Sequence, residues 1–325
     1  MKVYIVGKGA VGTYLGDLLR SQTTEVVYAP RALEDVVPVE AELAIVAVKS
    51  YDTEGAIETL RRAFGSNPAA TILCPQNGVG NEEKLAAVFG PDAIVSSALT
   101  VPVERTRNGS MIPSNAGGIA LAPVGNLAHN WLVAAFGESK IPVKVSADYR
   151  ALKWSKLSLN MVANASCAIL NVLPERLVHL DHMFSLEMRA MRECRAVMNA
   201  LGLGSVDLPG YSVRALQGVI SLPTPVARMI LASRIAGARG RKPPSLLLDL
   251  RLAKGQTEVD VLNGAVAAAG ESAGIPTPVN AAFWRVLSDI AHMPQLWAKY
   301  RERPQALLAE VDAEERRALD LHARA

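Results

Sequence analysis

Three polar side chains recur at four-residue spacing near the middle of the chain, in the stretch KWSKLSLNMVANA. They are Lys156, Asn160 and Asn164. Residues four apart lie on one face of an α-helix, so a helix over residues 153–165 presents an ammonium and two amides in one line. An ammonium stabilises negative charge that grows on a substrate oxygen and can donate the proton, while amides bind the polar groups of a small ligand. The alternative is structural, with Asn164 capping or cross-linking helices.

A glycine-rich stretch near the start of the chain has the pattern of a phosphate-binding loop. Its residues are Gly7, Lys8, Gly9, Ala10, Val11 and Gly12. The stretch follows a predicted strand and opens an amphipathic helix, the context in which G-x-G-x-x-G binds a dinucleotide. Gly7 allows the tight turn, Gly9 lets the backbone approach a pyrophosphate, and Gly12 lets the helix pack close to the sheet. The N-terminal amides of that helix favour an anion. A plain strand–helix turn is the alternative.

The end of the second predicted strand bears on the choice between NAD and NADP. NAD sites usually place an acidic residue there, whereas this chain has Tyr-Ala-Pro-Arg over residues 28–31. A guanidinium suits a 2′-phosphate better than a neutral ribose, so Arg31 favours NADP(H). Glu34 lies close in the sequence and keeps NAD open, as does the interpretation of Arg31 as a solvated loop residue.

Two further loops follow predicted strands, at the sheet edge where open α/β sheets bind ligands. The third strand ends before Lys49 in AVKSYDT, and the fourth ends before Asn77 in CPQNGVGNEE. Asn77 is the stronger candidate for a ligand-binding residue, because the glycine that follows its amide lets the backbone approach a ligand closely. Lys49 as a surface lysine and Asn77-Gly78 as a simple turn are the alternatives.

A second group of polar residues lies in the C-terminal half, in PPSLLLDLRLAKGQTEVDVLNG. The group consists of Ser245, Asp249, Glu258, Asp260 and Asn263. Thr257 and Glu258 are predicted to open a helix after a glycine-containing turn. Glu258 and Asp260 then either bind a ligand or complement the helix dipole in the first turn.

The elements that must carry these residues divide the chain in two. Residues 1 to about 145 alternate apolar strands (KVYIVG, EVVYA, ELAIVAV, ATILCP, AIVSSAL) with amphipathic helices, which predicts a parallel sheet with helices on both faces. Turn signals at Asn108-Gly109 and Gly117-Gly118 predict antiparallel strands that complete the sheet. From about Asp148 onward the pattern is helical. We therefore predict an α/β fold: an N-terminal Rossmann-type parallel-sheet domain at residues 1–147, followed by an all-α C-terminal domain at residues 148–325.

The composition argues against several classes of function. The 325 residues are 50% apolar with a formal net charge of +3, so no large field indicates a nucleic acid or an anionic membrane as partner. No apolar stretch reaches the roughly 20 residues that span a bilayer. The three cysteines are too few and too scattered for a disulfide framework or a zinc site, so we expect reduced, mostly buried thiols in a cytoplasmic protein. A basic cluster is interpreted as a solvated loop or an anion contact: Arg234, Arg239, Arg241 and Lys242.

Six stretches occur in the order, and at roughly the intervals, found in the ketopantoate reductases, also called 2-dehydropantoate 2-reductases. They are GKGAVG, AVKSYDT, PQNGVG, KWSKLSLNMVANA, PSLLLDL and GQTEVDVLNGAV. The chain resembles this family from residue 1 to about residue 300. The resemblance implies an enzyme that reduces a 2-oxo acid with NADPH, on the route to pantothenate and coenzyme A.

The resemblance also implies roles for the residues singled out above. Lys156 matches the family's general acid, and Glu258 matches the carboxylate that holds the substrate hydroxyl. The positions that match substrate-binding residues are Asn77, Asn160, Asn164 and Ser245. The positions that match cofactor-binding residues are Gly7, Lys8, Gly9, Ala10, Val11, Gly12, Arg31, Lys49, Asn77 and Glu258.

One departure from the family keeps other substrates and cofactors open. Only about a dozen residues separate Arg31 from the strand that begins near Leu43, where family members carry a longer insert with extra β structure. The first alternative is an NAD(P)-dependent D-2-hydroxy acid dehydrogenase of the same build, acting on another branched or aromatic 2-oxo acid. The second is a non-catalytic NADP-binding redox sensor, whose mark would be the loss of Lys156 or Glu258. The helical half has enough apolar surface for a homodimer.

Overall fold

The structure, a computed structural model, describes residues 1–325 apart from residues 22, 66–69, 106–110, 114–116, 128, 140, 181, 238–242 and 325. The chain forms two compact units. Unit 1 contains residues 1–156 and 205–213, and unit 2 contains residues 157–204 and 214–325. The sequence placed the domain boundary after residue 147, just before helix α5 (Tyr149–Met161). In the structure the chain first passes from unit 1 to unit 2 after residue 156, within α5.

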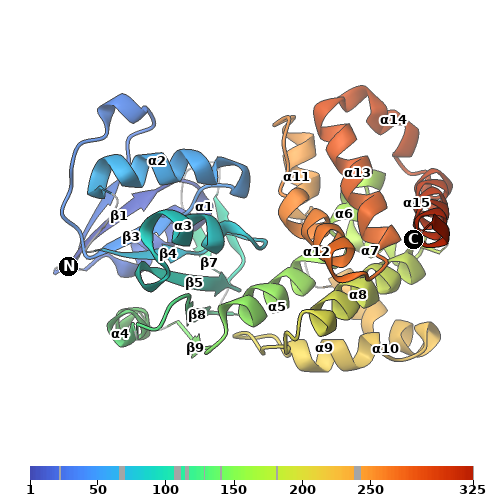
Figure 1. The fold of residues 1–325 in the computed structure, drawn as a ribbon, viewed down its shortest axis with the longest axis horizontal. Coiled ribbons are helices and arrows are strands. Elements are labelled where there is room, and N and C mark those ends of the chain that lie inside the picture. Colours follow the sequence, from blue (N-terminus) through green and yellow to red (C-terminus); the bar gives the residue numbers. More distant parts are fainter. Residues whose placement is uncertain are drawn as a thin grey trace. The chain divides into compact units, whose positions relative to one another are not determined.

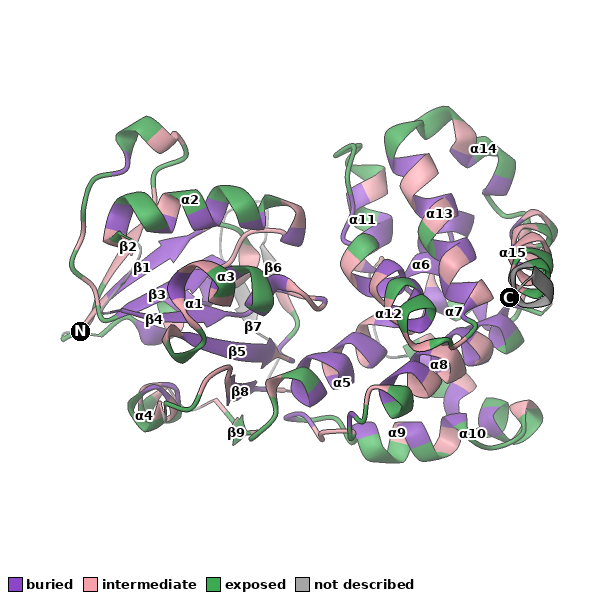
Figure 2. Cartoon of the chain, in the orientation of Figure 1, coloured by how far each residue is buried: buried purple, intermediate pink, exposed green. Residues whose placement is uncertain are grey.

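Unit 1 is built on a seven-stranded sheet with the order β2-β1-β3-β4-β5-β8-β9 (Figure 1). Its strands are β1 (Lys2–Val6), β2 (Glu25–Tyr28), β3 (Leu43–Val46), β4 (Thr71–Cys74), β5 (Ile94–Leu99), β8 (Ile119–Pro123) and β9 (Val143–Val145). The first five strands are parallel, as predicted. Every residue of β3 and β4 is buried, which is why both stretches are apolar throughout instead of alternating (Figure 2).

Helices cover both faces of this sheet. They are α1 (Ala10–Leu19), α2 (Thr53–Phe64), α3 (Asn81–Phe89) and α4 (Asn130–Glu138), with short 3₁₀ turns η1 (Leu33–Asp35), η2 (Ser50–Asp52) and η3 (Pro91–Ala93). One apolar core includes Leu15 of α1 and Phe136 of α4, and a second includes Leu60 of α2 and Phe89 of α3. The two cores lie on opposite faces because successive side chains of a strand alternate, so Ile5 belongs to the first and Tyr4 to the second.

The predicted antiparallel addition to the sheet is present. β8 pairs antiparallel with β5, and β9, which the sequence did not indicate, pairs parallel with β8. β6 (Val103–Arg105) and β7 (Met111–Pro113) form a separate antiparallel pair. The predicted turn at Asn108-Gly109 lies outside the described residues. Gly117 has φ +106°, a conformation that favours glycine.

Unit 2 is helical, as predicted. Its helices are α6 (Ala165–Leu170), α7 (Pro174–Leu177), α8 (Met183–Ala200), α9 (Val213–Ile220), α10 (Thr224–Gly237), α11 (Ser245–Arg251), α12 (Ala265–Ala273), α13 (Pro278–His292), α14 (Trp297–Tyr300) and α15 (Pro304–Arg324), with a π-helical turn η4 (Asp260–Gly264) and a 3₁₀ turn η5 (Pro294–Leu296). α13 packs against α6, α8, α12 and α15, so it forms the centre of the unit. The three cysteines of the chain are buried, as expected, and none of them forms a disulfide.

A half-buried carboxylate joins α8 to the start of α13. Glu193 accepts the backbone N–H groups of Val279 and Asn280 at 3.0 and 2.9 Å, and the Asn280 side-chain amide at 2.7 Å. Burial raises the pKa of Glu193 to about 7, although these hydrogen bonds oppose the shift.

Within the described part of the chain, no helix is both long and apolar enough to cross a lipid bilayer.

Candidate active site

The glycine loop after β1 has a different local requirement at each of its three glycines. Gly7 has φ +106°, and a Cβ there would lie 2.7 Å from the backbone carbon of Ala47. A Cβ on Gly12 would lie 2.0 Å from the Gly7 carbonyl oxygen. Gly9 is exposed, and a Cβ there would meet no described atom within 4 Å. Gly7 and Gly12 are therefore needed by the fold itself, whereas at Gly9 only a ligand would require the missing side chain.

The N-terminus of α1 is suited to an anion. Gly9 is the N-cap, no side chain caps the helix, and its first turn contains no acidic residue. The backbone N–H groups of a first helical turn have no partner within the helix and carry the positive end of its dipole. The chain therefore presents amide donors at Ala10 and Val11 beside the open space at Gly9.

The end of β2 carries basic groups and an aromatic ring. Arg31 is exposed, three residues beyond Tyr28, the last residue of the strand. The Lys8 ammonium of the glycine loop lies 5.0 Å from the centroid of the Tyr28 ring, within the range of a cation–π contact. Residues 29–42, all of them described, contain the single turn η1 and no strand. The short connection expected from the sequence is therefore present.

The loops after β3 and β4 share one hydrogen-bonded junction. Lys49 is the N-cap of η2, and Ser50 follows it. The Asn77 carbonyl accepts both Ser50 Oγ at 3.0 Å and Asn81 Nδ2 at 3.1 Å. The positive φ of Gly78 (+79°) turns the chain directly after Asn77. Lys49 and Asn77, which come from two different sequence motifs, are therefore carried by loops that are bonded to each other.

Helix α5 carries two lysines one turn apart with different surroundings. Lys156 and Asn160 are partly exposed, and their four-residue spacing places them on one face of the helix. Lys153 is only 2% exposed and forms an ion pair with Glu82, which is 1% exposed. Lys153 also donates to the Gln76 carbonyl, next to Asn77. The sequence did not single out Lys153, because its partners lie on other elements.

The predicted helix over residues 153–165 is interrupted, so Asn164 does not share a helix with Lys156. α5 ends at Met161, Ala163 has φ +48°, and Asn164 is the N-cap of α6. The side-chain amide of Asn164, instead of its backbone N–H, bonds the Asn160 carbonyl, at 2.9 Å. The regular four-residue spacing of three polar residues is therefore produced by a helix, a break and a helix cap.

The break is held by a carboxylate from another helix. Glu187 of α8 is 3% exposed and accepts the Ala163 N–H at 2.7 Å. It also accepts the hydroxyl of Ser166, in the first turn of α6. Burial raises the pKa of Glu187, and the two hydrogen bonds oppose that shift. Glu187 thereby accepts the Ala163 N–H, a backbone donor that a continuous helix would have bonded internally.

Two predicted substrate residues meet within unit 2. Asn164 Nδ2 donates to Ser245 Oγ at 3.3 Å, and Asn164 Oδ1 accepts the Leu246 N–H at 3.2 Å. Asn164 is 1% exposed, and its amide thus caps the start of α11. Both amide protons of Asn164 are bonded to protein atoms. The geometry therefore gives Asn164 the capping and cross-linking role that the sequence left as an alternative.

Glu258 lies just before a π-helical turn. It is 4% exposed and precedes η4, which leads directly into α12. π turns are rare and occur frequently at functional sites. Two further acidic residues lie in this segment: Asp249 forms an ion pair with Lys254 at 2.6 Å, and Asp260 accepts Trp284 Nε1 at 2.6 Å.

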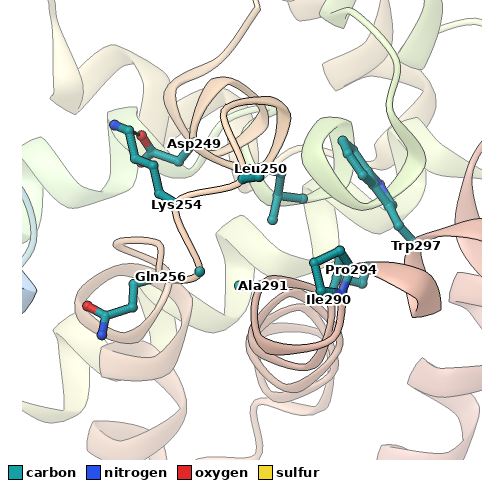
Figure 3. Close-up of a pocket in the computed structure, with 10 residues that line it drawn as sticks. Asp249, Leu250, Lys254, Gln256, Ile290, Ala291, Pro294 and Trp297 are labelled. Atoms are coloured by element: carbon teal, nitrogen blue, oxygen red, sulfur yellow. Dashed lines mark hydrogen bonds and ion pairs between the residues drawn. The ribbon is translucent and has the colours of Figure 1, made fainter.

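A small pocket lies beside the loop that precedes Glu258 (Figure 3). Its lining includes Asp249, Lys254, Gln256 and Trp297, and its empty space of about 240 Å³ includes open solvent. Ligand pockets usually measure about 300–1,000 Å³, and none of the predicted substrate residues lines this one. We assign it no ligand.

Of the basic cluster, Arg234 is exposed near the end of α10, and Arg239, Arg241 and Lys242 lie outside the described residues.

Comparison with known proteins identifies the family of the chain. Residues 20–126 match the family model described as ketopantoate reductase PanE/ApbA, and residues 148–291 match the model of its C-terminal part. A 2-dehydropantoate 2-reductase of Aquifex aeolicus is 25% identical over 308 residues, covering 86% of this chain and 94% of that protein.

Solved structures agree with the two-part fold. A PanE/ApbA family ketopantoate reductase from Ralstonia eutropha superposes with a TM-score of 0.74 at 28% identity, covering 91% of this chain and all of that one. D-mandelate dehydrogenase in complex with NADH has the same fold, with a TM-score of 0.72 at 19% identity, over 90% of this chain and 99% of that chain. The two family models follow each other along the chain and match parts of both units. The chain belongs to the ketopantoate reductase family of oxidoreductases.

Proposed function

We propose that this protein reduces 2-dehydropantoate (ketopantoate) to D-pantoate with NADPH. The observation that carries the proposal is the placement of Lys156 in a chain of this family. Lys156 is partly exposed on α5, one turn after Lys153, which is bonded to the Asn77 loop. That arrangement supplies an ammonium next to the sheet edge where open α/β sheets bind their ligands.

The glycine loop supports binding of a dinucleotide. The unfilled space at Gly9 and the uncapped first turn of α1 fit a pyrophosphate, which needs close backbone approach and N–H donors. Ala10 and Val11 would supply those donors. When bound, the nicotinamide cofactor supplies the hydride. Lys49 and Asn77, on the two neighbouring loops, would contact this cofactor.

The basic groups at the end of β2 support NADPH over NADH. No acidic residue stands at residues 28–31 to hold ribose hydroxyls, and Arg31 is exposed there. The Lys8 ammonium lies beside the Tyr28 ring, so a second cation accompanies Arg31 at this end of the loop. Two cations favour a 2′-phosphate over a neutral hydroxyl.

Lys156 has the role of general acid. As hydride reaches the ketone carbon, negative charge grows on the oxygen, and an ammonium beside it stabilises that charge and then donates the proton. Asn160, one turn along α5, would bind a polar group of the substrate. Glu258 would hold the substrate hydroxyl, with Ser245 as a further hydrogen-bonding group. Asn164 would act through Ser245 and α11, because its own amide is already bonded to protein atoms.

A second function has specific support. The connection between β2 and β3 is short, and the fold also matches that of D-mandelate dehydrogenase with NADH. A D-2-hydroxy acid dehydrogenase that uses NAD(P) and takes a branched or aromatic 2-oxo acid is therefore the alternative.

A substrate panel with both cofactors separates these functions. Oxidation of NADPH and NADH is followed by absorbance with ketopantoate, pyruvate and benzoylformate, and binding of each cofactor is measured by its fluorescence. Rapid NADPH oxidation with ketopantoate supports the proposal, whereas preference for NADH or benzoylformate supports the alternative. Cofactor binding without turnover on any 2-oxo acid would contradict both and favour a redox sensor.

A further inference from the structure

Unit 1 contains a buried ion pair that no step of the proposed reaction uses. The Lys153 ammonium lies 3.0 Å from Glu82 Oε1, and the two side chains are 2% and 1% exposed. Ser96 Oγ donates to the same carboxylate oxygen at 2.8 Å. Burial lowers the pKa of Lys153, but the neighbouring acidic groups, Glu82 first among them, raise that pKa by more, so the ammonium stays charged.

Such a pair needs an explanation other than stability. Taking two charges out of water costs several kcal/mol each, and neutral replacements of similar volume are often no less stable. A buried pair is better explained by the geometry that it imposes. Here the imposed geometry links α3, which carries Glu82, to α5, which carries Lys153.

The pair continues into the loops that carry two proposed ligand-binding residues. Lys153 donates to the Gln76 backbone carbonyl. The Gln76 side chain in turn donates to the Val48 carbonyl at 3.2 Å and to Thr53 Oγ1 at 2.9 Å. Lys49 follows Val48, and Asn77 follows Gln76. One ammonium therefore bonds directly to the loop after β4 and, through one amide, to the loop after β3.

A second route in the same network holds the Asn77 backbone. Thr53 Oγ1 donates to Asn81 Oδ1 at 3.0 Å, and Asn81 Nδ2 donates to the Asn77 carbonyl at 3.1 Å. Thr53 and Asn81 are 0% and 1% exposed, so water does not compete for these bonds. Asn81 is the first residue of α3, and Glu82 is the second. The hydrogen bonds through Asn81 and the ion pair through Glu82 therefore both start from the N-terminus of α3.

The same ammonium anchors the helical turn that precedes Lys156. Residues three apart in an α-helix lie on adjoining positions of one side, about 4.5 Å apart along the axis. Asp148 Oδ1 accepts the Ala151 N–H at 3.0 Å, and Tyr149 donates its hydroxyl to Glu83 of α3 at 3.2 Å. The N-terminal part of α5 is thus fixed against α3 at more than one point.

We propose that Lys153 and Glu82 are positioning residues: their ion pair holds the Lys156 turn of α5 in a fixed position relative to the loops of Lys49 and Asn77. This inference rests on the proposed roles of Lys156 and Asn77. It assigns different tasks to the two lysines of α5: Lys156 acts on the substrate, and Lys153 holds Lys156 in position.

The first experiment compares the wild-type protein with the double variant Lys153→Met/Glu82→Gln. The double variant removes both charges and keeps both side chains near their original length, whereas either single change leaves one buried charge unpaired. We expect a melting temperature near that of the wild type, with kcat for the 2-oxo acid reduced about 10-fold or more and a smaller change in KM, because small displacements of catalytic groups cost large factors in rate. Wild-type kcat in the folded double variant would overturn the proposal.

The second readout does not depend on turnover. Amide hydrogen exchange of the protein without ligands should become faster in residues 76–81 and 149–156 of the double variant. Unchanged protection in both segments would contradict the proposed link. If the double variant does not fold, Glu82→Asp replaces it, since this change keeps both charges and shortens the carboxylate arm by one methylene. The same fall in kcat and the same exchange pattern are expected, and their absence would also overturn the proposal.

A surface ion pair on the same helix provides the control. Lys84 of α3 and Glu54 of α2 lie 3.0 Å apart with side chains 49% and 71% exposed, so Lys84→Met/Glu54→Gln should leave kcat and exchange unchanged. Failure of the proposed function is distinguishable, because it would show as a lack of turnover by the wild-type protein on every 2-oxo acid. The exchange measurement would still test the link in that case.

Discussion

Replacing each glycine of the β1–α1 loop with alanine should separate the needs of the fold from those of the cofactor. The three positions lie within six residues, yet their surroundings differ. Gly7 has a positive φ, and an added Cβ there would meet the Ala47 backbone. An added Cβ on Gly12 would meet the Gly7 carbonyl, whereas one on Gly9 would meet no described atom within 4 Å. The same added methyl group therefore meets three different environments.

The expected losses of stability follow from those environments. At Gly7, alanine combines a sparsely populated φ of +106° with a Cβ 2.7 Å from a backbone carbon. Backbone strain of this kind costs about 1–3 kcal/mol, and overpacking costs a similar amount. At Gly12 the overlap is with a backbone oxygen at 2.0 Å, so the loop itself must move. We expect each variant to lose about 2–5 kcal/mol of unfolding free energy.

Gly9→Ala should behave in the opposite way. Its φ of −81° and ψ of −169° suit alanine, and no described atom lies within 4 Å of the new methyl group. Stability should be unchanged, or higher by up to about 1 kcal/mol, because alanine restricts the unfolded chain. Binding of NADPH should nevertheless weaken by about 10-fold or more, because the methyl group would occupy the space proposed for the pyrophosphate.

Two measurements check this pattern. Chemical denaturation gives the unfolding free energy, and titration of NADPH fluorescence gives the dissociation constant, both at the same pH and salt concentration. Gly55→Ala in α2 serves as the control, since it also has no described atom within 4 Å and lies away from the loop. Wild-type affinity of Gly9→Ala for NADPH would refute the placement of the pyrophosphate at this glycine.

Three further predictions concern single side chains. Lys156→Ala should reduce kcat by roughly 100-fold or more, the scale of a lost general acid, and near-normal turnover would show that the assignment is wrong. Arg31→Ala should raise KM for NADPH and leave KM for NADH almost unchanged, and equal effects on both would contradict the phosphate contact. Because the pKa of Glu193 is raised from 4.5 to about 7 in the folded state, its contribution to stability is fully present below about pH 4.5 and is lost as the pH rises through 7. The loss amounts to about 3 kcal/mol at most, and Glu193→Gln should flatten this part of the curve measured by urea denaturation; an unchanged slope would refute it.

Most of the fold of unit 1 could be predicted from the sequence because its signals are local. The apolar runs KVYIV, LAIV and TILC are each strands whose burial requires neighbours on both sides, and the intervening amphipathic helices supply the cover. The glycine loop could be recognised from its pattern between a strand and a helix, although the crowding at Gly7 comes from Ala47, at the end of the neighbouring strand β3. β9 was missed because VKV is an edge strand of only three residues, none of them buried, so it gives no long apolar run.

The side-chain arrangement around α5 required the tertiary structure. Periodicity placed Lys156, Asn160 and Asn164 on one helix, but Glu187 from α8 holds the chain in a break at Ala163. The sequence did contain part of the signal for the hydrogen-bond network around Lys153 and Glu82, since Gln76, Asn77 and Asn81 all belong to the stretch CPQNGVGNEE.

By itself, then, the sequence determined which residue types are available for chemistry and which segments become strands and helices, because both depend on neighbours along the chain. It did not determine which of two lysines on one helix is buried. Lys153 and Lys156 differ in their surroundings only because Glu82 and the Gln76 carbonyl lie opposite Lys153 in the folded unit. Burying a charge is costly unless it is paired and hydrogen-bonded, and the positions of such partners are set by packing between distant segments.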